Sequence, residues 1–156
     1  PRKPTKAALR RAAACLDRAA RLGQIDAMCE LGYCLVYGEG VRKDCRRAAP
    51  LYRRAADAGY DSAMFNLGMC YKQGRGVPRS IAKAVEWWLR AARLGCDRSL
   101  EHLAEAYAFG PPSLRDPARA RYYARRDAAQ KASSAAFDEQ FRSRIARRKA
   151  RAARHA

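Results

Sequence analysis

The chain has 156 residues and an ordinary hydrophobic fraction of 49%, but 33 lysines and arginines against 15 aspartates and glutamates give it a formal net charge of +18. No stretch approaches the roughly 18 consecutive apolar residues that a membrane-spanning helix needs, so we exclude a membrane span. Because surplus positive charge is self-repelling in a compact fold, it favours an anionic partner: nucleic acid, an acidic protein face or an anionic membrane surface.

Residues 5–23 are predicted to form one helix, the second half of an incomplete repeat, because Ala12–Gly23 matches Ala48–Gly59 at a spacing of 36 residues. The Arg-rich start also has the composition of an organellar targeting peptide. We favour the repeat, since this stretch lacks the serines typical of such peptides.

The same spacing relates a first full copy at 24–59 to a second at 60–95 and a weaker third at 96–131. Positions related in this way are called a column below. The columns shared by the first two copies are Ala27/Ala63, Leu31/Leu67, Gly32/Gly68, Gly38/Gly74, Gly40/Gly76, Val41/Val77, Ala48/Ala84, Ala55/Ala91, Ala56/Ala92 and Gly59/Gly95. A fixed period of this length indicates a solenoid of stacked repeats.

Each copy is predicted to fold as helix, tight turn, helix. In the first copy Ala27, Leu31 and Leu35 recur at i, i+4 and i+8, and so lie on one helical face. Gly38 and Gly40 then allow the chain to reverse, because glycine reaches positive φ at little cost.

The second helix of the first copy is predicted to begin after Asp44, whose carboxylate can cap it. Its buried face is expected to comprise Ala48, Leu51, Tyr52, Ala55 and Ala56. Small residues in fixed columns let neighbouring helices approach closely, so a leucine in place of Gly68 should overpack that contact.

The third copy departs from the pattern after its first helix. It keeps Leu103, Ala104 and Gly110, but Pro112–Ser113 replaces the second glycine and the valine of the turn. The aromatic pair Tyr122–Tyr123 arrives one residue early. We therefore expect a shortened loop in this copy.

Residues 132–156 are predicted to form a C-terminal capping helix and a basic arm. Phe137, Phe141 and Ile145 recur at i, i+4 and i+8, an apolar stripe able to cover the open end that the last repeat of a solenoid leaves. The arm has no acid after Glu139, and its candidate polyanion-binding residues are Arg142, Arg144, Arg147, Arg148, Lys149, Arg151 and Arg154. This density is typical of a segment that contacts nucleic acid or another polyanion; the alternative is a solvated helix end.

These residues carry a resemblance to a known family. The first copy contains the pattern Ala27-x3-Leu31-Gly32-x5-Gly38-x-Gly40-Val41-x2-Asp44-x3-Ala48-x2-Leu51-Tyr52-x2-Ala55-Ala56-x2-Gly59. It resembles the Sel1-like repeat, a relative of the tetratricopeptide repeat, over about residues 7–128. The resemblance implies an all-α fold: a right-handed α-solenoid of helix-turn-helix units over 1–131, followed by the capping helix and basic tail. It also implies an adaptor or scaffold.

The six cysteines raise the question of disulfides. The resemblance includes a secreted, disulfide-rich branch of the family. In that branch one cysteine closes the second helix, and another, eight residues later, opens the next repeat. The matching positions here are Ala20 and Met28, Ala56 and Met64, Ala92 and Leu100. We therefore interpret the thiols mainly as packing residues in core columns, with a stray disulfide or a metal site as weaker alternatives. Reduced thiols indicate an intracellular reducing compartment, the cytoplasm or an organellar matrix.

The first helices of the copies are expected to line the concave face, where helical-hairpin solenoids usually bind their partners. The candidate partner-binding residues are Glu30, Tyr33, Tyr37, Asn66, Met69, Gln73, His102, Glu105 and Phe109. Aromatic and methionine side chains mixed with polar ones suit a protein or peptide ligand. The alternative is that Tyr37 and Phe109 merely pack between repeats.

The second helices carry two columns of basic residues. These are Arg11, Arg47, Lys83 and Arg119, and, seven residues further on, Arg18, Arg54 and Arg90. They form either a surface for an anionic partner or a solvated outer face.

No Gly-rich phosphate loop, nucleophile elbow or Ser/His/Asp order is present, so we predict no enzyme activity, no cofactor and no metal site. The leading hypothesis is a protein–protein interaction scaffold, a structural subunit of a larger assembly, with protein partners at the concave face and the solenoid ends. The alternative is a nucleic-acid-associated component, such as a ribonucleoprotein or organellar ribosome subunit, that holds RNA or another polyanion through its Arg-rich termini.

Overall fold

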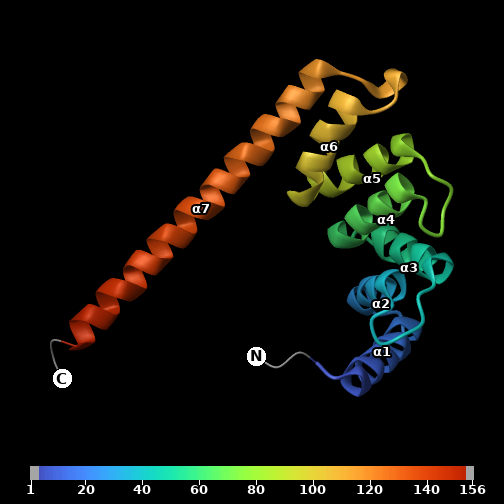
Figure 1. Ribbon diagram of the computed structural model, residues 1–156, viewed down its shortest axis with the longest axis horizontal. Helices are drawn as coiled ribbons and strands as arrows, with labels where there is room; N and C mark the ends of the chain where they lie inside the picture. Colours follow the sequence, from blue (N-terminus) through green and yellow to red (C-terminus); the bar gives the residue numbers. More distant parts are fainter. Residues whose placement is uncertain (1–3, 154–156) are drawn as a thin grey trace.

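The computed structural model describes residues 4–153; for Gln140, Phe141 and 143–153 it describes the backbone alone. Within that range the chain forms seven α-helices and one short 3₁₀ helix, and no strand (Figure 1). The helices are α1 (Lys6–Arg21), α2 (Ile25–Tyr37), α3 (Cys45–Asp57), α4 (Asp61–Gln73), α5 (Ile81–Arg93), α6 (Arg98–Phe109), η1 (Pro112–Leu114) and α7 (Pro117–Ala153). The predicted all-α class is confirmed. None of these helices is long and apolar enough to cross a membrane.

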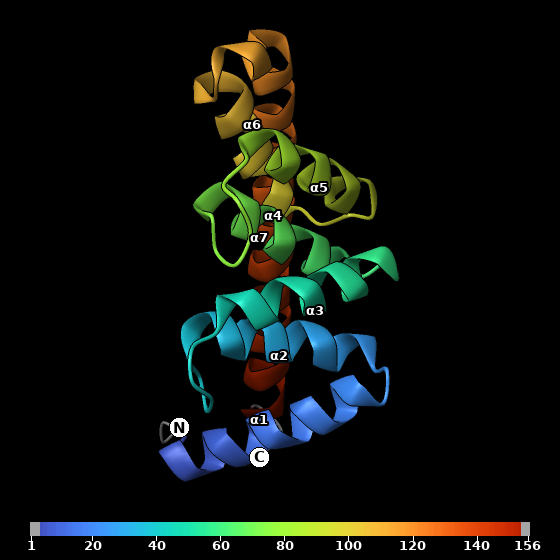
Figure 2. The ribbon, with the colours of Figure 1, turned by 90° about the vertical axis from the view of Figure 1, so that its right-hand side faces the viewer.

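The helices α1 to α6 stack into a curved array in which each packs mainly against its neighbours in the chain. Figure 2 shows α1, α2 and α3 lying across one end of this stack, with α4, α5 and α6 continuing it. Contacts between sequence neighbours are what a solenoid of helical hairpins requires, because each repeat buries its apolar face against the next.

The loops inside the first two repeats depend on glycine. Gly38 ends α2 in the left-handed region, as predicted, with φ of 79°. Gly40 also has positive φ and passes directly over the backbone carbonyl of Leu9 at the start of α1. Gly76 sits in the same way on the carbonyl of Cys45. A side chain at either position would collide with that backbone, so these glycines seat each loop on the preceding second helix.

Side chains cap the second helices of the first two repeats. Asp44 Oδ1 accepts a hydrogen bond from the Arg47 amide at 3.1 Å, and Ser80 Oγ accepts one from the Lys83 amide at 3.3 Å. Each cap satisfies an amide that the first turn of a helix otherwise leaves unpaired. The cap predicted at Asp44 is confirmed, and Ser80 performs the same role in the next repeat.

The core follows the predicted columns of small and aromatic residues. Gly32 lies against the ring of Tyr52, and Gly68 lies against the indole of Trp88. Trp88 is 1% exposed, and its Nε1 donates to the carbonyl of Phe65 at 3.3 Å. The absence of a side chain on the first helix therefore makes room for an aromatic ring on the second.

The third repeat closes its turn differently. The predicted shortening of its loop is wrong, because seven residues separate α6 from α7, as they separate α2 from α3 and α4 from α5. Gly110 has extended backbone with φ of −67° instead of the left-handed conformation, and η1 completes the turn. The aromatic pair is early because it lies one residue closer to the start of its helix.

The C-terminal cap also differs from the expectation. Residues 132–153 continue α7 without interruption, and Figure 1 shows this part of the helix pointing away from the array. Phe137, the first residue of the expected capping stripe, is 67% exposed, while the side chains of Phe141 and Ile145 lie outside the described residues. Residues 118–153 contain neither glycine nor proline, so nothing in the sequence stops the helix at the end of the third repeat.

Candidate partner-binding face

The nine predicted partner-binding residues lie on the first helices, three each on α2, α4 and α6, and none is buried. The exposed ones are Glu30, Tyr33, Tyr37, Gln73, Glu105 and Phe109, and the half-buried ones are Asn66, Met69 and His102. The structure divides them into two groups. One is an aromatic pair on α2, and the other surrounds His102 between α4 and α6.

Tyr33 and Tyr37 form the aromatic pair on α2. Their ring centroids lie 4.5 Å apart, and the Arg75 guanidinium lies 5.5 Å from the Tyr37 ring. Both tyrosines are still exposed. Tyr37 therefore has one neighbour from the next repeat but keeps surface available to solvent.

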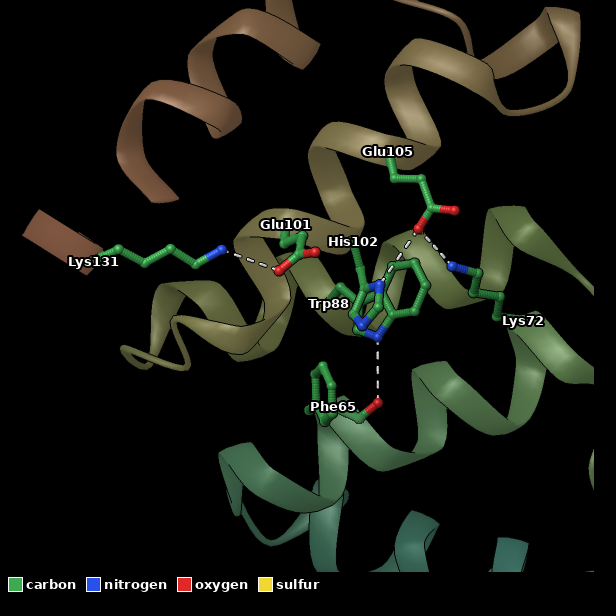
Figure 3. Close-up of polar contacts among 7 residues, drawn as sticks. All are labelled: Phe65, Lys72, Trp88, Glu101, His102, Glu105 and Lys131. Atoms are coloured by element: carbon green, nitrogen blue, oxygen red, sulfur yellow. Dashed lines mark hydrogen bonds and ion pairs between the residues drawn. The ribbon is translucent and has the colours of Figure 1, made fainter. Parts of the chain in front are cut away.

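His102 is the centre of the second group (Figure 3). Its ring stacks on Trp88, with centroids 5.0 Å apart and planes 23° apart, and the ring of Phe65 lies 5.6 Å away. His102 Nδ1 lies 3.5 Å from Glu105 Oε2, and in the described part of the chain it makes no hydrogen bond. The predicted surface histidine is thus held in place by aromatic rings of α4 and α5.

Glu105 connects two repeats. Lys72 Nζ of α4 donates to Glu105 Oε2 at 2.6 Å, and this hydrogen bond holds the pKa of Glu105 below its usual value. On the other side of α6, Lys131 Nζ of α7 lies 3.2 Å from Glu101 Oε2 (Figure 3). Ion pairs therefore join α6 to α4 on one side and to α7 on the other.

A cleft of about 410 Å³ opens beside this group, between α4, α5 and α6. Its lining comprises Lys72, Arg79, Ile81, Trp88, His102, Glu105, Ala106, Phe109, Gly110 and Pro111. Phe109 is 81% exposed. A second hollow, of about 490 Å³, lies on the other side of His102, where Phe65, Arg98 and Lys131 take part in its walls. The first cleft therefore offers an apolar surface bordered by the charged side chains of Lys72 and Glu105.

The repeat pattern is confirmed by comparison. A family model described as the Sel1 repeat matches residues 4–24, 25–60, 61–96 and 98–131. The chain belongs to the Sel1 repeat family. This is a family of non-catalytic repeat scaffolds that generally mediate protein–protein interactions.

Solved structures of Sel1 proteins resemble this chain. A Sel1 repeat protein from Oxalobacter formigenes is 30% identical with a TM-score of 0.69, over 78% of this chain and 49% of that one. The protein c5321, a protective antigen of uropathogenic Escherichia coli strains with an SLR fold, is 35% identical with a TM-score of 0.71, over 76% of this chain and 25% of that one. Helicobacter pylori cysteine rich protein B is 29% identical with a TM-score of 0.52, over 56% of this chain and 65% of that one. The Sel1 array of this chain therefore spans half or less of the length of the first two proteins. A comparison with curated proteins found no match.

Sequence reasoning missed part of the cleft. Lys72 and Trp88 both line it, although neither belongs to the predicted exposed stripe. One signal was present: Lys72 occupies the column of Val36, which is buried in the first repeat. A charge in an otherwise apolar column indicates a place where the array is open.

The arm residues lie on α7 or beyond it. Arg142 is exposed. Outside the described side chains are Arg144, Arg147, Arg148, Lys149 and Arg151, and Arg154 lies outside the described residues altogether. The helical backbone nevertheless continues to Ala153, so the arginines up to Arg151 are carried by a helix.

All six cysteines are free thiols. Cys29 and Cys70 are buried, and burial raises the pKa of each thiol to about 11. Cys96 is buried as well, whereas Cys15 is exposed, so the packing role predicted for Cys15 is wrong. No group of three or more candidate metal ligands occurs among the described residues.

Proposed function

We propose that this Sel1 array is a protein-interaction scaffold that binds a peptide segment across α4, α5 and α6. The observation that supports the proposal is the cleft beside His102, with Phe109 exposed at its edge and Trp88 in its lining. Phe109, the last residue of α6, presents its ring to solvent, and aromatic side chains are enriched at protein interfaces.

The chemistry of the cleft suits an apolar anchor flanked by polar groups. A partner side chain would lie against Phe109, and Ile81 extends the apolar lining, while the buried Trp88 supports the ring of His102 from below. The Lys72–Glu105 pair offers a donor and an acceptor to the partner backbone. Because the rings around His102 are already packed, little side-chain freedom is lost on binding.

The experiment begins with selection of short random peptides displayed against the intact chain. The selected peptides are then titrated against Phe109→Ala and, as a control, Leu94→Ala, which removes an exposed apolar side chain away from the cleft. We expect Phe109→Ala to weaken binding by about tenfold or more and Leu94→Ala to leave it unchanged. Failure to select any peptide, or equal binding by both variants, contradicts the proposal.

The role of the whole protein is part of the same proposal. We place the array as a structural subunit of a larger assembly, in the cytoplasm or an organellar matrix. This chain has no cysteine at the positions where the disulfide-rich branch of the family carries its cysteine pairs, which supports a reducing compartment.

A second candidate function, contact with nucleic acid, is favoured by α7. This helix carries the arginine-rich segment away from the array, and no acid follows Glu139 (Figure 1). Contacts would be made to phosphates, so they would be independent of base sequence. We expect log K for RNA to fall by about 4–6 per tenfold rise in salt, and a chain ending at Glu139 to lose several units of that slope. An unchanged slope assigns the arm to another role.

A further inference from the structure

A groove between α1 and α3 lies outside the proposed peptide site. The helix α2 passes between these two helices (Figure 2), and its Leu31 takes part in the lining. The groove has a volume of about 390 Å³, large enough for one or two apolar side chains. A hollow of about 290 Å³ shares Asp17, Arg21, Leu31 and Arg47 with it and extends it along α1 to Arg10.

The next repeat shows why this groove is open. Leu51 of α3 lines the groove and is half-buried, and Trp87 of α5 occupies the same column. Trp87 is 6% exposed, with the Arg53 guanidinium of α3 5.2 Å from its ring centroid and that of Arg90 at 4.7 Å. Between α3 and α5 an indole thus fills the space between successive second helices. Between α1 and α3 the smaller leucine leaves the corresponding space empty.

The rim of the groove is basic. Asp17 is its only acid, and both of its oxygens are engaged: Oδ2 lies 2.7 Å from Arg21, and Oδ1 lies 3.4 Å from Arg47. Arg46 and Arg54 are exposed, and neither has an acidic partner within residues 4–153. Two unpaired guanidinium groups therefore stand over an apolar lining.

We infer that this groove binds an acidic peptide segment, whose apolar side chain fills the space beside Leu51 and whose carboxylates pair with Arg46 and Arg54. Guanidinium forks match carboxylates in geometry as well as charge. The lining is aliphatic, from Ala20, Leu31 and Pro50, and contains no aromatic ring on which a nucleic-acid base could stack. The combination favours a peptide over a nucleic acid. On this inference Arg54, one of the basic residues repeated on the second helices, contacts a peptide carboxylate.

The test uses the full chain and a pool of short synthetic peptides in which glutamates alternate with leucine, isoleucine or phenylalanine. Two comparison probes are the same pool with glutamine for glutamate, and polyglutamate. We expect each comparison probe to bind at least about tenfold more weakly than the acidic apolar pool, because one lacks the charge and the other lacks the anchor. Equal binding of all three overturns the inference.

Variants locate the site. Leu51→Trp is expected to fill the groove as Trp87 fills the next one, and so to lower affinity at least about tenfold without lowering the thermal midpoint. The double variant Arg46→Ala/Arg54→Ala has only exposed positions and is expected to lose affinity to a similar extent. Arg18→Ala is the matched control, since Arg18 shares the column of Arg54 but does not line the groove.

The outcomes separate this groove from the other surfaces. Phe109→Ala should leave binding of the acidic pool unchanged, because Phe109 belongs to the cleft of the proposed function. Retention of full affinity by the Arg46→Ala/Arg54→Ala variant overturns the inference. So does binding of a short RNA that competes with the peptide pool and is lost in Leu51→Trp, because that result assigns the groove to nucleic acid.

Discussion

Gly68 has no side chain, and the indole of Trp88 packs against its backbone in the space that a side chain would occupy. A Cβ at this position would overlap the ring, which is itself held by its hydrogen bond to Phe65 and by the stacked His102. Gly68→Leu is therefore expected to lower the free energy of unfolding by about 1–3 kcal/mol, measured by urea denaturation. An unchanged free energy contradicts this account of the contact.

The partner variant shows whether Trp88 is the cause. In a Trp88→Leu background the ring is gone, so Gly68→Leu should cost less than it does in the parent. The same cost in both backgrounds would mean that the leucine disturbs the helix for another reason.

Removing the hydroxyl of Ser99 should stabilise the protein. This hydroxyl is fully buried and has no hydrogen-bond partner in the described part of the chain, in a column that holds Ala27 and Ala63 in the earlier repeats. Ser99→Ala is expected to raise the free energy of unfolding by about 1 kcal/mol, because a buried polar group without a partner is costly. The control is Ser62→Ala, which loses only a 3.3 Å bond from Arg98 and should stay within about 0.5 kcal/mol of the parent. A less stable Ser99→Ala protein contradicts the prediction.

At the scale of the element, α7 combines two different parts. Its first turns pack on α6, where the rings of Tyr107 and Tyr123 stack with centroids 5.8 Å apart. Its later part points away from the array (Figure 1). A chain ending at Glu139 should therefore keep the thermal midpoint of the intact protein, whereas one ending at Arg121 should melt lower because it loses Tyr123. A large drop on truncation at Glu139 would show that the end of the helix does cover the array.

The helices and their turns could be predicted because each depends on residues close in sequence. The loop at Gly38 and Gly40 and the cap at Asp44 are examples, since positive φ and a side-chain acceptor are local requirements. The cleft could not be predicted in the same way. The stack of His102 on Trp88 joins different repeats, and a column pattern gives the face of each residue but not the direction of its ring.

The distal part of α7 was predictable in one respect and not in another. The absence of glycine and proline after Pro117 indicates a continuous helix. The stripe from Phe137 has the spacing of a buried face, yet Phe137 is exposed. Apolar periodicity shows that a helix has a face to bury, but it does not say which surface receives that face.

At the scale of the molecule, the array is a row of elements stabilised by their neighbours, so its stability should vary along the row. The helices α3, α4 and α5 have a packed helix on either side, while α1 packs mainly on α2, and the later part of α7 points away from the array (Figure 1). In native-state hydrogen exchange we expect the slowest amides in α4 and α5 and faster exchange in α1 and in α7 beyond Lys131, because terminal elements open without the rest. Uniform protection from α1 to α7 would instead show that the chain unfolds as one cooperative unit, and that the long helix is held by contacts beyond its packing on α6.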